Sequence, residues 1–303
     1  MKQPNAKALI IIAFFAIYVV WGSTYLFNKI AVTQLSPLFL SATRFTFAGI
    51  LILIISKILN YSLKITKRQL VNAAIAGFLF LVYGNGVFVW SLRYVDSGFG
   101  ALLASTQPLF VLLLMRLIDR KKMQKKSIIG VVLGIIGMYL LVSQQNITTD
   151  ETNILAIFMI LSCVFSWSYG SVFVSKADLP ENFFVSTGYQ MITASFFLIC
   201  GSFLFNEEIL LPNLWTNEVQ LAMIFLIIFG SIVAFTAFNY LLKKVSTEKV
   251  ATSAYINPII ALFLGWLVLG EQLTTQSIIA AGILLTGVYF ITSRKRYKSD
   301  KNT

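Results

Sequence analysis

The feature that most constrains this chain is a series of ten long apolar stretches separated by short polar segments. A helix needs about 20 apolar residues to cross the hydrocarbon layer of a bilayer, and most of the stretches reach about that length. None of them alternates polar and apolar residues as barrel strands do, so each predicts a membrane-spanning helix. The predicted spans cover residues 8–27, 37–56, 69–91, 98–118, 127–143, 153–175, 182–205, 219–242, 249–269 and 275–292.

The composition agrees with a chain that is surrounded by lipid. Hydrophobic residues make up 57% of it and charged residues only 12%, whereas an average soluble protein is about 25% charged. The first stretch follows Lys2 and Lys7 as in a signal peptide, but no small-residue cleavage site comes after it, so we interpret it as a span. The sequence therefore predicts an all-α, multi-pass protein of the bacterial cytoplasmic membrane, with the lipid bilayer as its partner. Both a monomer and a homodimer stay open.

The basic residues alternate along the chain in a way that predicts topology. Of the 24 Lys and Arg residues, 21 lie at the two termini or in every second loop. The other loops hold only Lys29 and Arg93, and Arg44 lies inside a span. Cytoplasmic loops carry an excess of basic residues, so both termini are predicted to be cytoplasmic. The net charge of +12 comes mainly from these loops, where basic residues meet anionic lipid headgroups at the membrane surface. We therefore expect no nucleic-acid partner.

The two halves of the chain repeat each other. Residues 98–142 align with residues 248–292 without a gap, and 11 of the 45 aligned positions are identical. A weaker match relates WGSTYLF, at residues 21–27, to WSYGSVF, at residues 167–173. The sequence therefore predicts two repeats of five spans each.

Five spans per repeat is an odd number, so the two repeats enter the membrane from opposite sides. The loop charges agree with this inversion, since the loop at 57–68 is basic whereas its counterpart at 206–218 is acidic. Inverted repeats are typical of secondary transporters, whose substrate sites lie near the membrane midplane where the repeats meet. We expect one membrane domain made of residues 1–147 and residues 148–303.

Two prolines stand at equivalent positions of the repeats, Pro108 in the fourth span and Pro258 in the ninth. Proline kinks a helix and frees a backbone carbonyl, so both helices are predicted to bend around a cavity. Gln107, Tyr255 and Asn257 would then face water or substrate. The alternative, that the prolines only set helix curvature for packing, stays open.

Several of these motifs resemble one family. WGSTYLFNKIAV at 21–32, the stretch around Pro108, and NPIIALFLGWLVLGEQLTTQSIIAAGILLTGVYF at 257–290 resemble the EamA-type branch of the drug/metabolite transporter superfamily, over nearly the whole chain. The resemblance implies a ten-helix inner-membrane permease, in a family where many members export amino acids or other small metabolites. In that family a Gly-Glu pair usually follows the fourth and the ninth span. Here Gly270-Glu271 has Arg120-Lys121 as its counterpart, and we interpret Glu271 as a structural residue.

Arg44 is the sharpest candidate for a substrate contact. It lies about seven residues inside the second span, or roughly 10 Å deep, and no acidic residue lies at a matching depth in another span. A cation there costs at least about 2.5 kcal/mol unless it is paired or hydrated. We expect its planar guanidinium to bind a substrate carboxylate or phosphate. The alternative is that Arg44 snorkels to the outer interface.

Further aromatic and polar residues recur at similar depths in both halves and predict the wall of a small-molecule pocket. Each also fits a role in helix packing or in an interfacial aromatic belt. These candidates are Tyr18, Trp21, Tyr83, Trp90, Gln107, Trp167, Tyr189, Gln190, Asn239, Tyr255 and Asn257.

The sequence predicts a secondary transporter that moves a small organic metabolite, an amino acid or a derivative, outward by alternating access. Import of a metabolite and efflux of drugs are the alternatives within transport, and cationic drugs fit poorly with Arg44. A lipid-modifying membrane enzyme is a further alternative. The chain has no histidine and no GxxxxGK[ST], HExxH or GxSxG motif, so we predict no catalytic residue, no cofactor and no metal site.

Overall fold

The computed structural model describes residues 6–119, 125–143, 151–251 and 253–292. The regular elements among these residues are all helices, with no β-strand among them. Within the described ranges, seven helical stretches are long and apolar enough to cross a membrane: Lys7–Val32, Pro37–Ile58, Lys67–Ser91, Ser97–Ile118, Ile154–Lys176, Phe183–Leu204 and Asn217–Lys244. Three shorter apolar helices, Ile128–Gly137, Ile256–Leu269 and Thr275–Gly287, fall within the other three predicted spans. The chain is therefore an all-helical, multi-span membrane protein.

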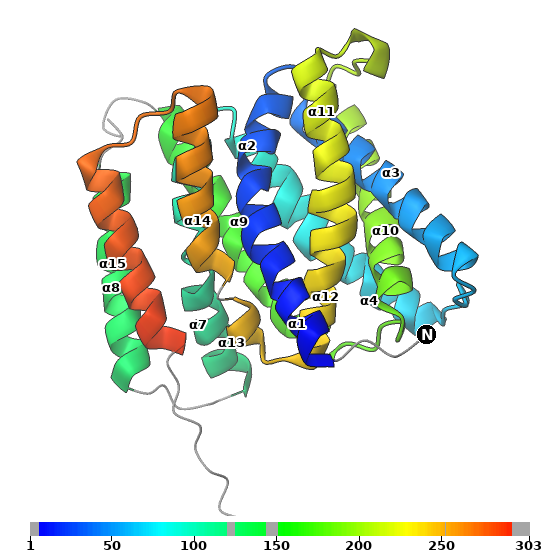
Figure 1. The fold of residues 1–303 in the computed structure, drawn as a ribbon, viewed down its shortest axis with the longest axis horizontal. Coiled ribbons are helices and arrows are strands. Elements are labelled where there is room, and N and C mark those ends of the chain that lie inside the picture. Colours follow the sequence, from blue (N-terminus) through cyan, green and yellow to red (C-terminus); the bar gives the residue numbers. More distant parts are fainter. Residues whose placement is uncertain (1–5, 120–124, 144–150, 252, 293–303) are drawn as a thin grey trace, which may run out of the picture.

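Several predicted spans consist of more than one helical element, because α-helices alternate with π-helical turns. Figure 1 shows how the α-helices are arranged. The first half contains α1 (Ala6–Phe15), the π-helical η1 (Ala16–Val20), α2 (Trp21–Val32), α3 (Pro37–Ile58), α4 (Lys67–Gly77), the π-helical η2 (Phe78–Val87), α5 (Phe88–Ser91), α6 (Ser97–Ala104), α7 (Gln107–Asp119) and α8 (Lys125–Val142). The second half contains α9 (Glu151–Lys176), α10 (Phe183–Leu204), the 3-10 turn η3 (Pro212–Leu214), α11 (Asn217–Phe225), the π-helical η4 (Leu226–Val233), α12 (Ala234–Lys244), α13 (Thr247–Val250), α14 (Ser253–Leu264), the π-helical η5 (Gly265–Leu269) and α15 (Thr275–Thr292).

The helix ends follow from local side-chain chemistry. Thr66 and Gln69 form a reciprocal capping box at the start of α4, and the Asn182 side chain accepts hydrogen bonds from two backbone N–H groups of α10. At their other ends α3 and α10 are followed by Asn60 and Asn206, whose φ angles are 58° and 49°. Asparagine tolerates this left-handed conformation better than most residues, so the second and seventh spans end in the same way.

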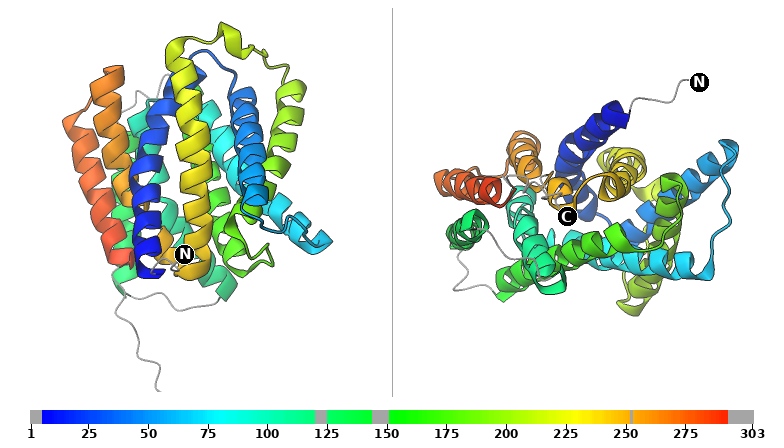
Figure 2. Two further views of the ribbon diagram at one scale, coloured as in Figure 1. Left: turned by 45° about the vertical axis from the view of Figure 1, so that its right-hand side comes forward. Right: turned by 90° about the horizontal axis from the view of Figure 1, so that it is seen from below.

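The packing of the helices is reciprocal between the two halves. Equivalent helices of the two halves pack on each other: α3 packs against α10, and α8 packs against α15. These two pairs form opposite edges of the bundle (Figure 2). Other contacts come in matching sets: α14 packs on α2 as α7 packs on α9, and η4 packs on α3 as α4 packs on α10. Each of these contacts has a counterpart in which the roles of the halves are exchanged.

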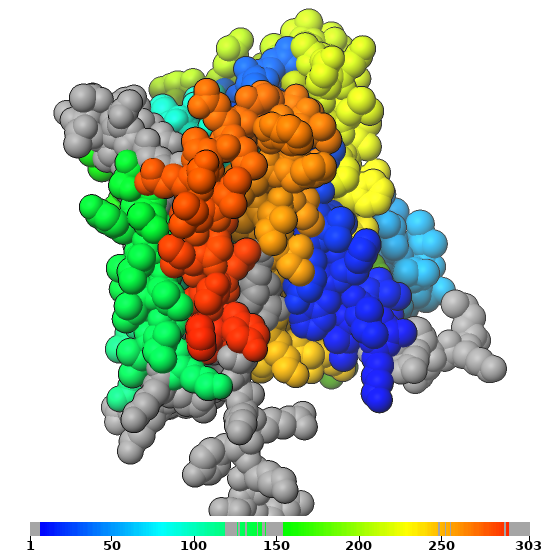
Figure 3. Space-filling view, turned by 60° about the vertical axis from the view of Figure 1, so that its left-hand side comes forward, coloured from blue at the N-terminus to red at the C-terminus, as the bar shows by residue number. Residues whose placement is uncertain are grey.

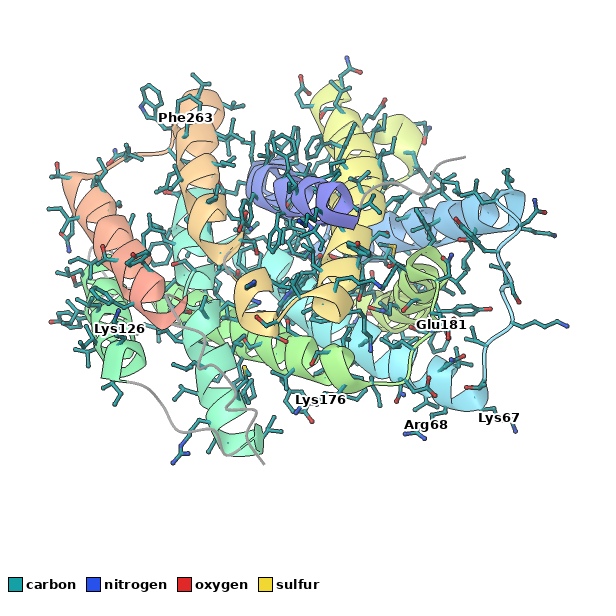
Figure 4. The ribbon with its side chains drawn as sticks, turned by 60° about the horizontal axis from the view of Figure 1, so that its bottom comes forward. Lys67, Arg68, Lys126, Lys176, Glu181 and Phe263 are labelled. Carbon is teal, nitrogen blue, oxygen red and sulfur yellow. The ribbon has the colours of Figure 1, made fainter. Side chains whose placement is uncertain are left out.

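The two ends of the bundle differ in charge. The start of α1 and the end of α15 lie at the same end, drawn lowest in Figure 1. Figure 4 turns this end toward the viewer and shows Lys67, Arg68, Lys126 and Lys176 there. At the opposite end, Glu207 accepts hydrogen bonds from the backbone N–H groups of Leu38 and Phe39 in the first turn of α3, at 3.1 and 2.7 Å. A carboxylate suits this place because a helix N-terminus is electropositive.

Glu271 makes a second such contact, with the start of α6. Gly270 ends η5 with a φ of 66°, which turns the chain back on itself. The Glu271 carboxylate then accepts hydrogen bonds from Ser97 N at 2.9 Å, Ser97 Oγ at 2.7 Å and Gly98 N at 3.1 Å. Glu271 thus ties the segment between α14 and α15 to α6, which agrees with a structural role.

Replacing Glu271 by alanine is expected to lower the free energy of unfolding by about 1–3 kcal/mol, because two N–H groups at the start of α6 lose a charged partner. Thermal unfolding of the purified protein measures this loss. Glu208→Ala is the matched control, since Glu208 is exposed at the same end. Equal stability of the two variants would contradict the capping role.

The α8–α15 pair rests on close backbone contact at a glycine. A Cβ atom at Gly287 would lie 2.8 Å from the carbonyl oxygen of Gly130 and 3.0 Å from the nitrogen of Gly134. α8, α15 and α14 lie together on one face of the molecule (Figure 3). These helices carry large exposed apolar side chains that suit contact with lipid: Ile128, Ile135, Tyr139, Phe263, Ile278 and Tyr289.

We expect Gly287→Leu to separate α8 from α15 and to destabilise the protein by at least about 1–3 kcal/mol, the usual cost of overpacking. Gly282→Leu lies on the same helix, and a Cβ atom there meets nothing within 4 Å. Unfolding temperatures of both variants in the same detergent test this contrast, and an unchanged value for Gly287→Leu would refute the close contact.

Candidate substrate cavity

A cavity lies in the middle of the bundle. The space that the centres of water molecules can occupy within it is ≈ 110 Å³. One water needs about 10–15 Å³ on this measure, so the cavity has room for several waters or a small organic molecule. Both halves of the chain line it. The described lining residues are Trp21, Thr24, Tyr25, Asn28, Arg44, Phe45, Leu81, Gly84, Asn85, Phe88, Ala101, Ala104, Ser105, Gln107, Cys163, Val164, Trp167, Gly230, Phe235, Ser253, Ala254 and Asn257.

The cavity has walls from two separate hydrophobic clusters. Phe88 and Val164 belong to one cluster, and Phe45, Leu81 and Phe235 belong to the other. Polar groups gather where the two clusters meet, because apolar packing does not close that space.

The π-helical turns supply backbone groups to the cavity wall. A π-turn leaves carbonyl groups without their α-helical partners, and such turns are frequent at functional sites. In η2 the carbonyl oxygen of Tyr83 accepts a hydrogen bond from Cys163 Sγ at 3.3 Å. In η4 the carbonyl oxygen of Gly230 accepts one from Trp21 Nε1 at 3.1 Å. Each bond joins one half to the other, so side chains of the first and sixth spans hold the widened third and eighth spans.

Arg44 extends from α3 into the cavity and is only 3% exposed. Its Nε donates a hydrogen bond to Ser231 Oγ at 2.7 Å, and its Nη1 donates a long one to Asn28 Oδ1 at 3.4 Å. The guanidinium carbon lies 4.9 Å from the centre of the Phe45 ring. All of these partners are neutral, and no Asp or Glu occurs among the described lining residues.

Aromatic rings form one side of the cavity. The Trp21 and Trp167 rings meet edge to face, with centroids 5.5 Å apart. Trp21 lies 4.9 Å from Phe238, and Trp167 lies 4.9 Å from Phe80. We call Trp21, Phe80, Trp167, Phe235 and Phe238 the aromatic cluster; they come from the first, third, sixth and eighth spans. Trp21 and Trp167 are equivalent in the two repeats, and here they are in contact.

The fourth span is interrupted beside the cavity, between α6 and α7. The hydroxyls of Ser105 and Thr106 donate to the carbonyl oxygens of Leu102 and Leu103, at 2.6 and 2.7 Å, and so compete with the helical pattern. Pro108 has no N–H to continue that pattern, and it stands at the second residue of α7, where none is needed. The polar residues that precede Pro108 therefore form a helix break at which Ser105 and Gln107 face the cavity.

In the ninth span the interruption and the proline do not coincide. α13 ends at Val250 and α14 begins at Ser253, whereas Pro258 lies inside α14. In the amide orientation that gives both its oxygen and its nitrogen suitable neighbours, Asn257 donates to the carbonyl oxygens of Tyr18 at 2.8 Å and Ile17 at 3.0 Å, both in η1. Asn257 thereby joins the ninth span to the first.

Of the sequence-predicted site residues, Arg44, Trp21, Gln107, Trp167 and Asn257 line the cavity. Six others lie elsewhere, in contacts that their size and polarity explain. Tyr18 packs on Phe14, Trp90 packs on Phe205, and the Tyr83 hydroxyl donates to Ser162 Oγ. The Tyr189 hydroxyl donates to the carbonyl oxygen of Leu63, and Gln190 and Asn239 hydrogen-bond each other between α10 and α12. The side chain of Tyr255 and residues Arg120 and Lys121 lie outside the described part of the structure.

The sequence did not single out several polar lining residues, among them Thr24, Asn28, Asn85 and Ser253. Asn85 is notable because its Oδ1 is buried without a hydrogen-bond partner. Helical spacing in the sequence could have identified two of them, because Thr24 and Asn28 follow Trp21 at successive three- and four-residue intervals on one helix face.

A polar network lies at the end of the bundle where α6 begins. Lys29 Nζ donates to the carbonyl oxygens of Leu92 and Val95, at 2.7 and 2.8 Å. Burial raises the pKa of the Asp96 carboxyl, and the negative charge of Glu271 raises it further, while Lys29 acts in the opposite direction. Together with the Glu271 cap, these contacts hold the segment between α5 and α6.

Comparison with known proteins identifies the family. The model of the EamA-like transporter family matches this chain twice, over residues 8–143 and 154–293. The chain is 35% identical to the "Uncharacterized inner membrane transporter YedA" of Escherichia coli (strain K12), over 93% of this chain and 90% of that protein. It is 23% identical to the "Uncharacterized transporter YoaV" of Bacillus subtilis (strain 168), over 93% and 96% of the two chains.

Another relative carries a more specific name. The "Probable amino-acid metabolite efflux pump" of Escherichia coli (strain K12) is 23% identical over 95% of this chain and 94% of its own length. One solved crystal structure superposes with a TM-score of 0.70 over 95% of this chain and 97% of that chain, at 18% identity, and so shows the fold alone.

The family match covers most of both halves, and these relatives are named as transporters. The protein is therefore a multi-pass transporter of the inner membrane and not an enzyme. The chain belongs to the EamA-like transporter family.

Proposed function

We propose that this protein is a ten-helix secondary transporter, with both termini in the cytoplasm, that exports a small organic metabolite, an amino acid or a derivative, by alternating access. The residues that hold the substrate are Arg44, the cavity amides and the aromatic wall. The partners in this proposal are the substrate and the lipid bilayer, and the protein acts as a monomer or a homodimer.

Three observations support two repeats of opposite orientation, residues 1–147 and 148–303. The family model matches once in each half. The helix contacts are reciprocal when the halves are exchanged, as a pseudo-two-fold axis in the membrane plane would require. Lys67, Arg68, Lys126 and Lys176 lie at the end of the bundle where α1 begins and α15 ends, which by the positive-inside rule faces the cytoplasm.

The single observation that carries the substrate proposal is a buried arginine in a cavity between the halves, with no acidic lining residue in the described part of the chain. Its planar fork suits a carboxylate, and the site disfavours cationic cargo. The unpartnered Asn85 Oδ1 supplies a hydrogen-bond acceptor that an ammonium group can use. A carboxylate and an ammonium group on one small molecule describe an amino acid.

Alternating access needs a closure on each side of the cavity. The aromatic cluster lies toward the end where α1 begins, and the network of Lys29, Glu271 and Ser97 lies toward the other end. In the proposed cycle the two closures open in turn while the repeats rock about the cavity. The broken helices at Ser105–Thr106 and near Ser253 provide the hinges.

Transport by the purified protein in lipid vesicles tests the proposal. Vesicles are loaded with a panel of radiolabelled amino acids, and release is followed with and without the protein. Saturable, protein-dependent release of at least one amino acid is the expected result. Saturable release of cationic drugs alone, with no amino acid moving, would contradict the proposed substrate class.

A further inference from the structure

The charge of Arg44 is not balanced within the described cavity. Its Nε and Nη1 bond to the neutral oxygens of Ser231 and Asn28, and neither Asp nor Glu lines the cavity in the described residues. Acidic residues elsewhere in the sequence lie at or beyond the ends of the spans, as Asp96, Glu207 and Glu271 do. A buried cation without a counter-charge is costly even when it is hydrogen-bonded.

Two helix N-termini add to the positive potential of the same cavity, and the C-terminus of α6 at Ala104 offsets part of it. α7 begins at Gln107 and is 13 residues long, and α14 begins at Ser253 and is 12 residues long. Gln107, Ser253 and Ala254 all line the cavity. A helix N-terminus carries about half a positive charge, and interrupted helices in transporters use such ends to bind anionic groups.

A cavity with one arginine, two helix N-termini and no described acidic group should not stay without an anion. The volume is large enough for several waters, so a small hydrated ion from solution can enter. We propose that the substrate-free cavity binds one small inorganic anion of the chloride type against Arg44, and that a substrate carboxylate displaces it. This proposal rests on the same Arg44 contact as the proposed function, but its binding test needs no transport.

The anion site has a defined geometry around Arg44. Ser231 anchors Nε on one side and the Phe45 ring covers the guanidinium carbon, while Asn28 accepts only the long bond from Nη1. Gly230 adjoins Nη2, because a Cβ atom there would lie 3.0 Å from it. The weakly bonded Nη side of the guanidinium, which faces the cavity, is therefore where the anion binds.

Chloride binding to the full-length protein in detergent, without substrate, tests the proposal directly. The ³⁵Cl resonance is expected to broaden in proportion to the protein concentration. Arg44→Gln should abolish the protein-dependent broadening, whereas Arg93→Gln, which removes an exposed arginine of the loop before α6, should leave it unchanged. No broadening with the wild-type protein, or equal broadening with Arg44→Gln, would overturn the site.

A thermal measurement on the same samples covers the case in which Arg44→Gln does not fold. Chloride replaces isethionate, a larger sulfonate, at constant ionic strength. Since a ligand that binds only the folded state stabilises it, the wild-type unfolding temperature should rise by about 2–4 °C and saturate. Acetate should compete with chloride for the site, so that chloride raises the unfolding temperature less when acetate is present. A flat response to chloride, or a response that acetate leaves intact, would overturn the proposal.

The outcome separates this proposal from the proposed function. Amino-acid release from vesicles without any chloride binding leaves the transport function standing and overturns the anion site. Chloride binding that depends on Arg44, without release of any amino acid, supports the anion site and overturns the proposed substrate class.

Discussion

Replacing Arg44 by alanine is expected to lower the transport of carboxylate-bearing substrates by at least about 30-fold, while the protein stays folded. Removing one partner of a buried, hydrogen-bonded charge pair costs about 2–5 kcal/mol, and about 1.4 kcal/mol corresponds to a factor of ten. Folding should survive because the protein groups that bond to Arg44, Ser231 and Asn28, are neutral, so its loss leaves no buried protein charge unpaired.

Initial rates of labelled amino-acid release from vesicles measure this effect. Arg44→Lys keeps the charge but not the planar fork, so we expect a rate between those of wild type and Arg44→Ala. Arg93→Ala is the matched control, because Arg93 is exposed in a loop. Wild-type rates in a folded Arg44→Ala protein would refute the carboxylate contact.

A valine in place of Gly230 is expected to reduce the transport of every substrate, charged or neutral, by roughly 100-fold. The Cβ atom alone would lie 2.9 Å from Thr24 Cγ2 and 3.0 Å from Arg44 Nη2. The added methyl groups therefore occupy cavity space and displace the guanidinium, and a misplacement of about 1 Å can cost a factor of about 100. Overpacking should also lower stability by about 1–3 kcal/mol.

The effect of Gly230→Val is read against Gly282→Val, which places the same side chain where nothing lies within 4 Å. Rates for a neutral and a carboxylate-bearing substrate are compared with each variant. The two variants at the cavity should differ, since Arg44→Ala removes selectivity for the carboxylate and Gly230→Val removes the space itself. Normal transport by Gly230→Val would show that this cavity is not the transport route.

The positions of the spans could be predicted because the length of an apolar run is a strong signal. The predicted span at 37–56 corresponds to α3, Pro37–Ile58, and the predicted span at 182–205 corresponds to α10, Phe183–Leu204. The first span extends to Val32, five residues beyond the predicted end at 27. Its polar end stays helical because Lys29 finds two carbonyl oxygens, of Leu92 and Val95, which hydropathy does not detect.

The candidate site was harder to predict because depth in the membrane does not fix which way a side chain points. Arg44, Trp21 and Trp167 lie on the faces that meet the cavity. Gln190 and Asn239 lie at similar depth, but there the Gln190 Nε2 donates to Asn239 Oδ1 between α10 and α12. Equivalent residues of the repeats also differ in role: Trp21 and Trp167 are in contact, yet Tyr189, near the counterpart of Arg44, bonds to a loop carbonyl.

The helix breaks in the fourth and ninth spans differ in position, although the two prolines are equivalent in sequence. Pro108 and Pro258 are equivalent in sequence, but only Pro108 follows an interruption directly, because Ser105 and Thr106 bond to the preceding turn. Pro258 is preceded by Asn257, whose amide bonds to the first span instead. The prediction of two alike kinks used the prolines alone, whereas the neighbouring polar side chains decide where a helix ends.

The opposite orientation of the two halves can be measured by labelling single cysteines. In a protein with Cys163 and Cys200 replaced by alanine, one cysteine at a time is placed at four exposed loop positions: Ser62, Arg93, Glu208 and Ser246. A maleimide that does not cross membranes is applied to intact cells and to inside-out vesicles. Positions 93 and 208 should react in intact cells, and positions 62 and 246 only in inside-out vesicles. Labelling of the equivalent positions 62 and 208 from the same side would contradict inverted repeats.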